Sequence, residues 1–349
     1  MVREGETIGG LIGVLYEHPE WFKPLFAEME RRQLRYEPVL AHEARFDPVR
    51  TESPYDLVVN RMSPSSYLRG HGSAIFFTRE YLAHLETIEV SVVNGLAAWS
   101  LETSKASQIA LYQRLGLPYP RSIVVNHTSQ IEAAATSLVY PILLKPNIGG
   151  SGALMQRFTS PAELQGALDQ GLIELGPDRV GIVQEYHPPA DRCIVRVEAL
   201  DHEFLYAIRI ETEPEQGFNL CPADICQLED APQAAETNSF EFCVAPAPEK
   251  RALHIEAFTP PGDVIDAVLA INRAGQLDIG GVEYLQSSRD GRRYFYDINA
   301  LSNFVTDAQT VVGFDPFERF VDYLERRLEQ ANRPQERAAS APRRLAVSS

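Results

Sequence analysis

The stretch that decides the fold runs from Tyr140 to Gly152 and reads YPILLKPNIGGSG. Its apolar first half has the character of a β-strand, and residues 154–158 have the character of a return strand. Lys145 stands near the end of the first strand, where a buried ammonium group is costly unless it meets an anion. The glycine-rich turn Gly149-Gly150-Ser151-Gly152 allows the backbone to approach that anion and present amide hydrogens. The stretch therefore predicts a lid over a polyphosphate.

An ordinary hairpin whose lysine reaches solvent is the alternative, and on this stretch alone the two interpretations are equal. The turn is not a P-loop, because that motif needs G-x-x-x-x-G-K-[ST] leading into a helix.

A second group of candidate residues is acidic. Asp297 and Asn299 alternate on a predicted strand over residues 293–299, so their side chains share one face. Glu283 lies on the preceding predicted strand, and hairpin pairing through Asp290-Gly291 would bring it to the same surface. Two carboxylates and an amide oxygen are hard ligands that suit magnesium bridging ATP phosphates. A solvated strand face is the alternative.

Between these groups, the apolar strand over residues 180–186 ends in polar side chains and suits a hinge whose backbone reads an adenine edge. Arg196 and Arg209 each lie inside β-like runs, where an inward-facing guanidinium needs a carboxylate or phosphate partner. A structural ion pair is the alternative for both and is favoured for Arg196. Arg61 and Arg69 would attract an acidic substrate, but a solvated surface position is favoured for them.

The bulk composition narrows the function. The chain has 349 residues, enough for two or three domains, with 32 basic and 48 acidic residues and a formal charge of −16. This balance argues against a general nucleic-acid binder but allows an anionic ligand in a local cleft. No apolar run approaches the roughly 20 residues that span a bilayer, and the four cysteines are too scattered for a disulfide framework. We expect a cytoplasmic protein with no membrane partner.

The pattern along the chain predicts two kinds of unit. The first hundred residues alternate β-like runs with amphipathic stretches, as in a parallel sheet covered by helices. A second unit starts near Thr103 with a helix that stops at Gly116, and Ser129 and Ser160 are each expected to cap a later helix. Residues 229–249 have the composition of a loop or flap, a helix over residues 264–271 is expected to stop at Gly275, and residues 333–349 are expected to be disordered.

Taken in order, these segments resemble the ATP-grasp superfamily, most closely its glutathione-synthetase-like and ribosomal-protein glutamate ligase branch. The resemblance covers roughly residues 56–322 and includes Thr103-Ser104-Lys105, residues 115–120, residues 141–152 and the two acidic strands. It implies an α/β and α+β fold, in which an N-terminal Rossmann-like (pre-ATP-grasp) domain precedes a two-lobed ATP-grasp fold. The implied boundaries are 1–102 for that domain, 103–186 for lobe A with the glycine-rich loop, 187–330 for lobe B with the metal site, and 331–349 for the tail.

The resemblance also implies roles for single residues. Lys105 and Lys145 would contact ATP phosphates, and Asp191 would bind ribose. Arg209 would steady the transferring phosphoryl group. An adenine pocket would be formed by Gln184, Glu185 and Tyr186. A site for one or two magnesium ions would be formed by Glu283, Asp297 and Asn299. Two departures from the family pattern concern Asp191, whose spacing to the following arginine is shifted, and Asn219, which lacks the usual neighbouring glycines.

The predicted activity is that of an ATP-dependent ligase that joins a carboxylate to an amine through an acyl-phosphate. ATP and Mg2+ are the expected cofactors, and small-molecule or peptide carboxylates and amines are the expected substrates. Two alternatives stay open: an ATP-binding module that has lost activity and acts as a sensor or partner, and a phosphotransferase on the same fold. A homo-oligomer would fit the base rate for soluble enzymes.

Overall fold

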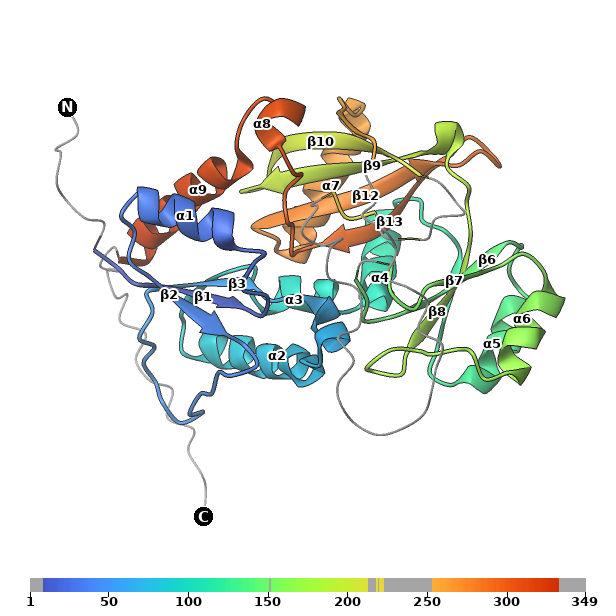
Figure 1. The fold of residues 1–349 in the computed structure, drawn as a ribbon, viewed down its shortest axis with the longest axis horizontal. Helices are drawn as coiled ribbons and strands as arrows, with labels where there is room; N and C mark the ends of the chain where they lie inside the picture. The colour runs from blue at the N-terminus through green and yellow to red at the C-terminus, as the bar shows by residue number, and fades with distance from the viewer. Residues whose placement is uncertain (1–8, 151, 213–217, 219, 223–252, 333–349) are drawn as a thin grey trace, which may run out of the picture.

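The structure is a computed structural model that describes residues 9–150, 152–212, 218, 220–222 and 253–332. It contains three sheets (Figure 1), and the first is a parallel sheet in the order β2-β1-β3-β4. Its strands are β1 (Ile12–Tyr16), β2 (Tyr36–Leu40), β3 (Leu57–Arg61) and β4 (Ser91–Val93). Helix α1 (Lys23–Arg31) lies over one side of this sheet and α2 (Gly72–Thr87) over the other, as Figure 1 shows.

Two lobes follow the N-terminal sheet in the chain, each built on an antiparallel sheet. The second sheet belongs to the smaller of them, which we call lobe A. Its antiparallel strands lie in the order β5-β8-β6-β7. They are β5 (Ser122–Val125), β8 (Gly181–Glu185), β6 (Ile142–Pro146) and β7 (Gln156–Phe158). Helices α5 (Ile131–Ala135) and α6 (Pro161–Asp169) pack on it and share with it a hydrophobic core drawn from lobe A alone. Lobe A is therefore packed as a unit of its own.

The third sheet forms lobe B and has the order β11-β10-β9-β12-β13. Its strands are β9 (Cys193–Leu200), β10 (Glu203–Glu211), β11 (Ile255–Ala257), β12 (Ile279–Gln286) and β13 (Arg293–Asn299). One face packs on α7 (Gly262–Gly275), α3 (Leu96–Glu102) and α4 (Lys105–Leu115). The opposite face shares a core with the N-terminal sheet, α1 and the last helix, α9 (Pro316–Asn332).

Asn94, directly after β4, fastens the N-terminal sheet to lobe B. Its side-chain oxygen accepts hydrogen bonds from the backbone of Asp278 and Ile279, at 2.8 and 3.2 Å. Its amide nitrogen donates to the carbonyls of Ile279 and Ala300 at 2.7 and 2.6 Å. These buried bonds add to the shared core, so the two units form one packed body.

Three predicted helix ends are confirmed and one is wrong. Gly116 ends α4 in the left-handed conformation, and the Ser160 hydroxyl accepts a hydrogen bond from the Glu163 amide at the start of α6. Ser129 caps nothing, because α5 starts at Ile131 without a side-chain cap. Gly275 is the last residue of α7, as predicted, and Gln276 after it takes the left-handed conformation.

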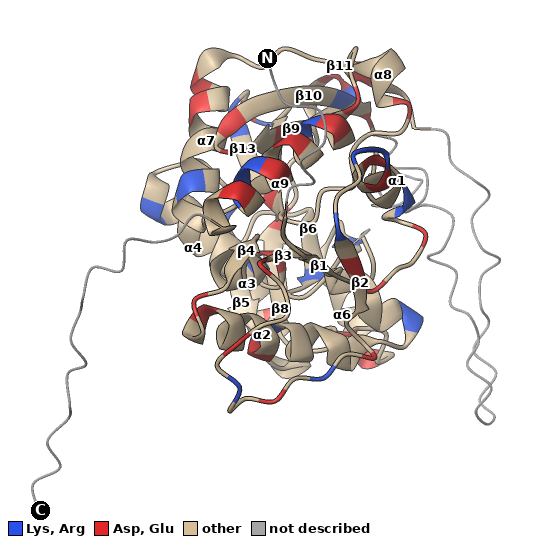
Figure 2. Cartoon of the chain, turned by 90° about the vertical axis from the view of Figure 1, so that its left-hand side faces the viewer, with Lys and Arg blue, Asp and Glu red and all other residues tan. Residues whose placement is uncertain are grey.

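The distribution of charged residues and the apolar character of the helices can be followed over the described residues. On the side shown in Figure 2, basic and acidic residues lie interspersed along the helices and strands. No described helix is long and apolar enough to cross a membrane. The predicted flap at residues 229–249 and the predicted disordered tail at 333–349 fall outside the described residues.

Candidate active site

A cleft of about 210 Å³ opens between the N-terminal sheet and the two lobes. Lys105 and Lys145 line it together with Glu283, Asp297 and Asn299. These five residues come from segments far apart in the sequence, and the fold brings them to one place. The structure therefore brings together the lysines and oxygen donors that the sequence singled out.

Lys105 is the first residue of α4, and its position is fixed by the start of that helix. Ser104 caps α4, and Asn147 accepts hydrogen bonds from the amides of Lys105 and Ala106 at 3.2 and 2.9 Å. The Lys105 ammonium lies 2.5 Å from a carboxylate oxygen of Asp297. Burial alone would lower the pKa of Lys105, but the Asp297 carboxylate outweighs it and the pKa is raised. Lys105 therefore carries its charge before any nucleotide binds.

Lys145 lies on β6 in a different electrostatic state. Its neighbours Ile142 and Leu144 point into the core of lobe A, whereas Leu143 and Lys145 line the cleft, as the period of two on a strand requires. The side chain is 4% exposed, and no described carboxylate pairs directly with its ammonium. Burial and, next, the positive charge of Lys105 lower the pKa of Lys145 to about 7. Lys145 is thus a desolvated cation that an anionic ligand would stabilise.

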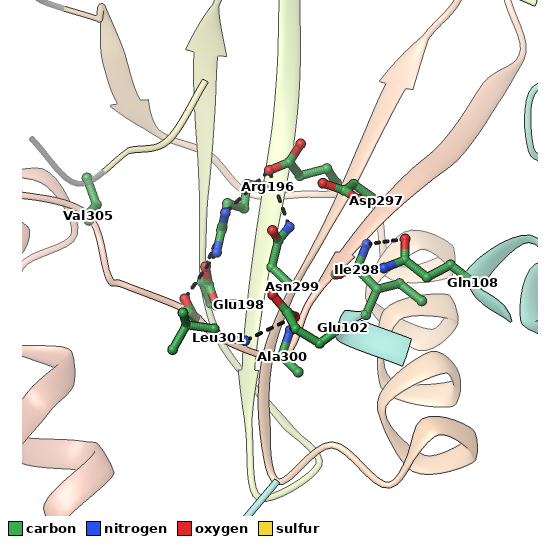
Figure 3. Close-up of polar contacts among 12 residues, drawn as sticks. Glu102, Gln108, Arg196, Glu198, Asp297, Ile298, Asn299, Ala300, Leu301 and Val305 are labelled. Carbon is green, nitrogen blue, oxygen red and sulfur yellow. Dashed lines mark hydrogen bonds and ion pairs between the residues drawn. The ribbon is translucent and has the colours of Figure 1, made fainter. Parts of the chain in front are cut away.

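The oxygen donors are arranged by strand pairing. Glu283 on β12 lies directly opposite Asp297 on β13, and Gly281 lies opposite Asn299. Figure 3 shows Asp297 and Asn299 of β13 near Arg196, which lies on β9 on the other side of β12. Burial, followed by the Asp297 charge, raises the pKa of Glu283. Among the described residues no three His, Cys, Asp or Glu side chains form a metal cluster, and the two carboxylates plus one amide oxygen stay a predicted donor set.

The glycine-rich loop closes over the cleft between two other parts of the chain. A Cβ added to Gly150 would lie 3.0 Å from Ser65 of the N-terminal unit. A Cβ added to Gly152 would lie 2.5 Å from the backbone of Phe218, and the φ of Gly152 is +70°. Gly149 also lines the cleft, and Ser151 falls outside the described residues. Glycine at position 152 is required both by its conformation and by this close approach.

Where the cleft reaches lobe A, it is lined by the end of β8 and the residue after it, the segment predicted from the sequence to bind adenine. Gln184, Glu185 and Tyr186 all line it. Gln184 donates to the Ser122 hydroxyl at 2.8 Å, and Glu185 accepts from the Val139 amide at 3.0 Å. These side chains are held in place by lobe A itself, which makes the strand end a fixed edge for a planar ligand.

Arg209 and Asp191 do not line the cleft, so the structure contradicts the positions expected for them. Arg209 on β10 pairs with Val195, whose side chain packs on the α7 face of lobe B. Its guanidinium lies near the Phe258 ring and 3.4 Å from the Asp191 carboxylate, which is itself 81% exposed. The alternation of side chains along β10 places Arg209 on the face turned away from the site.

Arg196 is the arginine that lines the cleft. It is 4% exposed, and its guanidinium bonds Glu198 at 2.6 Å, Glu283 at 3.3 Å and the Ser302 hydroxyl at 3.2 Å. The favoured interpretation of Arg196 as a structural ion pair is therefore correct but incomplete. The sequence signal was the alternation of Arg196 and Glu198 on a strand that is otherwise apolar.

Glu102 also lines the cleft, and no pattern in the sequence pointed to it. It is the last residue of α3, and its carboxylate accepts hydrogen bonds from the backbone of Ala300 and Leu301 (Figure 3). Burial raises its pKa to about 7. It fixes the chain directly after β13, where the predicted metal donors Asp297 and Asn299 lie.

Arg61 and Arg69 are not solvated, contrary to expectation. Arg61 is 1% exposed and lies between the Phe22 and Phe320 rings. Arg69 forms an ion pair with the buried Glu17 at 2.6 Å.

Comparisons with solved structures place this arrangement among known folds. The ATP-grasp ligase PsnB, complexed with a minimal precursor, superposes with a TM-score of 0.61 over 92% of this chain and 100% of its own, at 17% identity. The D-cycloserine synthetase DcsG gives a TM-score of 0.61 over 91% of this chain and 100% of its own, also at 17% identity. This chain has the ATP-grasp fold. The N-terminal parallel sheet and the two antiparallel sheets agree with the fold class expected from the sequence.

The D-alanine–D-alanine ligase of Bacillus anthracis, complexed with ATP, superposes with a TM-score of 0.60 over 92% of this chain and 97% of its own, at 13% identity. PsnB has also been solved with its minimal precursor, Mg and ADP, with a TM-score of 0.58 and 16% identity over 94% of this chain and 99% of its own. No protein-family model matches the chain, and no curated protein matches it in sequence. At these identities the likeness establishes the fold and leaves the branch of the superfamily open.

Proposed function

We propose that the protein is a magnesium-dependent ligase that uses ATP to join a carboxylate to an amine through an acyl-phosphate. One observation carries this proposal: two lysines and a pair of facing carboxylates from distant segments line one cleft beneath a glycine-rich loop. The ATP-grasp fold and the ligase activity stated for PsnB and the D-alanine–D-alanine ligase support it.

The two lysines would bind the triphosphate in different ways. Lys105 would exchange part of its contact with Asp297 for phosphate oxygens, while Lys145 would gain the anionic partner that the described cleft does not give it. Phosphoryl transfer depends chiefly on such positioning and charge neutralisation, and it needs no protein nucleophile.

Glu283, Asp297 and Asn299 fit a magnesium site, because a carboxylate pair with an amide oxygen offers the hard oxygen ligands that this ion prefers. When bound, magnesium would neutralise charge on the phosphates. Before ligand binds, Lys105 and Arg196 balance the same two carboxylates.

Arg196 takes the place that the sequence assigned to Arg209. Its guanidinium lines the cleft beside Glu283 and is oriented by Glu198, so it can face charge that develops on the transferring phosphoryl group and on the tetrahedral intermediate. The glycine-rich loop, pressed against Ser65 and Phe218, would keep water away from the acyl-phosphate.

A positional isotope experiment tests the proposal. The protein is incubated with ATP, magnesium, an amine pool and carboxylates labelled with oxygen-18, and the released phosphate is analysed by mass spectrometry. A ligase transfers one labelled oxygen to phosphate, because the carboxylate oxygen attacks the γ-phosphorus and leaves with it when the amine displaces phosphate. A phosphotransferase would leave a phosphorylated product and no free phosphate. Tight ATP binding with no turnover across the pool would favour the sensor.

A further inference from the structure

The cleft continues past the phosphate-binding region to an end formed by the N-terminal unit. We call this the tryptophan end; its described walls include the apolar side chains and hydroxyls of Trp21, Pro64, Leu220, Leu301, Ser63 and Ser65, and the neighbouring Cys221 and Asn303 also line the cleft. Trp21 and Leu301 belong to one hydrophobic cluster with Tyr16 and Phe22. Figure 1 shows α1 and the N-terminal sheet on the opposite side of the molecule from β8, whose end forms the proposed adenine site. The tryptophan end is thus available to a substrate other than the nucleotide, and in the proposed reaction the carboxylate must reach the phosphates from the same cleft.

The hydroxyls at this end are already oriented by the protein. Ser63 and Ser65 lie 2.9 Å apart at their oxygens, and Ser63 also accepts a hydrogen bond from the Ser65 amide. Behind them, Arg69 donates to the Ser65 oxygen at 3.3 Å. The pair is fixed and neutral, so it suits hydrogen bonding to an uncharged polar group.

The cations near this end are already engaged. Arg69 donates to both carboxylate oxygens of the buried Glu17, and its guanidinium lies 4.7 Å from the centre of the Trp21 ring. Arg196 is held by Glu198 and Glu283.

The other described cations do not serve the tryptophan end. Lys105 is paired with Asp297. Lys145 stands on β6 of lobe A, on the nucleotide side, and Arg61 does not line the cleft. Within the described residues, a second carboxylate at the tryptophan end would thus find no cation that is not already engaged, because Arg69, the cation that contacts Ser65, is paired with Glu17.

We propose that the tryptophan end binds the carboxylate substrate and that this substrate is uncharged and largely apolar beyond its reacting carboxylate. The inference rests on the proposed ligase function for the identity of the reacting group. Its physical basis is the cost of placing a charge among apolar walls without a partner, which exceeds the gain from neutral hydrogen bonds to the two hydroxyls. The site would therefore discriminate against side chains of the glutamate or aspartate type.

Equilibrium binding tests this specificity without relying on turnover. The full chain, loaded with magnesium and a non-hydrolysable ATP analogue, is titrated calorimetrically with N-acetylated amino acids and N-acetyl-Gly-X dipeptides in which X is Leu, Phe, Asp, Glu or Lys. We expect the Leu and Phe members to bind at least about tenfold more tightly than the Asp, Glu and Lys members. Equal or tighter binding of a charged member overturns the inference, and so does a lack of binding by every Leu and Phe member.

A charge-introducing variant sharpens the test. Leu301→Arg places a cation at the tryptophan end and should raise the affinity for Asp and Glu members at least about tenfold while weakening the Leu members. Leu172→Arg is the matched control, because Leu172 is 55% exposed on lobe A and does not line the cleft. An identical response of both variants would overturn the location. If Leu301→Arg does not fold, the panel on the unaltered chain still decides the question.

Fluorescence locates the bound ligand. The chain has two tryptophans, so in Trp99→Phe the emission comes from Trp21 alone. We expect this emission to change on titration with Leu or Phe members, and an unchanged spectrum at saturation would place the ligand elsewhere. Binding of the ATP analogue is measured in the same samples. Its loss would count against the proposed ligase, whereas nucleotide binding with the wrong carboxylate preference would count only against this inference.

Discussion

The electrostatic state of Lys145 makes the sharpest prediction. Burial lowers its pKa from 10.5 to about 7, a shift that corresponds to at most about 5 kcal/mol of unfavourable free energy in the charged folded state. This cost is fully present below pH 7, where folded and unfolded chains both carry the charge. It declines between pH 7 and 10.5, because there the unfolded chain binds more protons, and it vanishes above that range. Without nucleotide, Lys145→Met should therefore stabilise the protein at pH 6.5 by a few kcal/mol, and this gain should fall below about 1 kcal/mol at pH 10.

ATP should reverse this state, because phosphate oxygens favour the protonated lysine. With a pKa near 7, Lys145 is about one-tenth protonated at pH 8, so ATP binding should take up about 0.9 proton. Calorimetric titration in buffers of different ionisation enthalpy measures this uptake directly. Lys145→Met should lose it along with most of the affinity, whereas Lys23→Met, at an exposed lysine, should retain both. Nucleotide binding without proton uptake at pH 8, or destabilisation of the nucleotide-free Lys145→Met protein at pH 6.5, would refute the reasoning.

Three further predictions concern other parts of the cleft. Arg196→Lys should lower kcat at least about 100-fold and leave the ATP Kd within about threefold, while Arg209→Lys should leave both constants unchanged. The kinetics of phosphate release measure kcat for both variants, and equal losses would contradict the assignment of Arg196. Asp297→Asn should raise the magnesium concentration for half-maximal turnover at least about tenfold, and the exposed Asp263→Asn should not. Gly152→Ala should raise the KM for ATP at least about tenfold, whereas Gly171→Ala, with a similar φ of +66° but no atom within 4 Å, should affect only stability, by about 1 kcal/mol.

The parts of the site that the sequence predicted depend on local rules. The period of two along β6 and the hairpin joining β12 to β13 suffice to place Lys145 beside a loop and Glu283 opposite Asp297. Such features need only strand identity and register. A strand lysine followed by a glycine-rich turn is therefore informative from the sequence alone.

The arginine assignment failed for a reason that local rules cannot remove. Arg196 and Arg209 both lie in apolar strands, and the alternation of side chains along a strand shows only that each arginine shares a face with the residues two positions away. Which face meets the cleft depends on the packing of α7 against Val195 and Ala207, and that is a tertiary fact. The same holds for Glu102, whose partners are backbone amides about 200 residues away.

Strand β2 and helix α3 are among the elements that the sequence did not predict, because their patterns are weak. Strand β2 is an edge strand with a proline at position 38 and half-exposed side chains, and α3 has only seven residues. The division of the chain at residues 103 and 187 stays a prediction. Helix α4, at the start of the predicted lobe A, packs against α7 and β13 of lobe B.

The junction at Asn94 determines which groups would move together if lobe A swung outward. The predicted metal donors, Arg196 and the tryptophan end all belong to the body that Asn94 fastens, whereas Lys145, the glycine-rich loop and the adenine edge belong to lobe A with its separate core. An outward swing of lobe A would release spent nucleotide and leave the other substrate seated. Under the proposed function, that arrangement would let the nucleotide exchange while the other substrate stays bound to the body that Asn94 fastens.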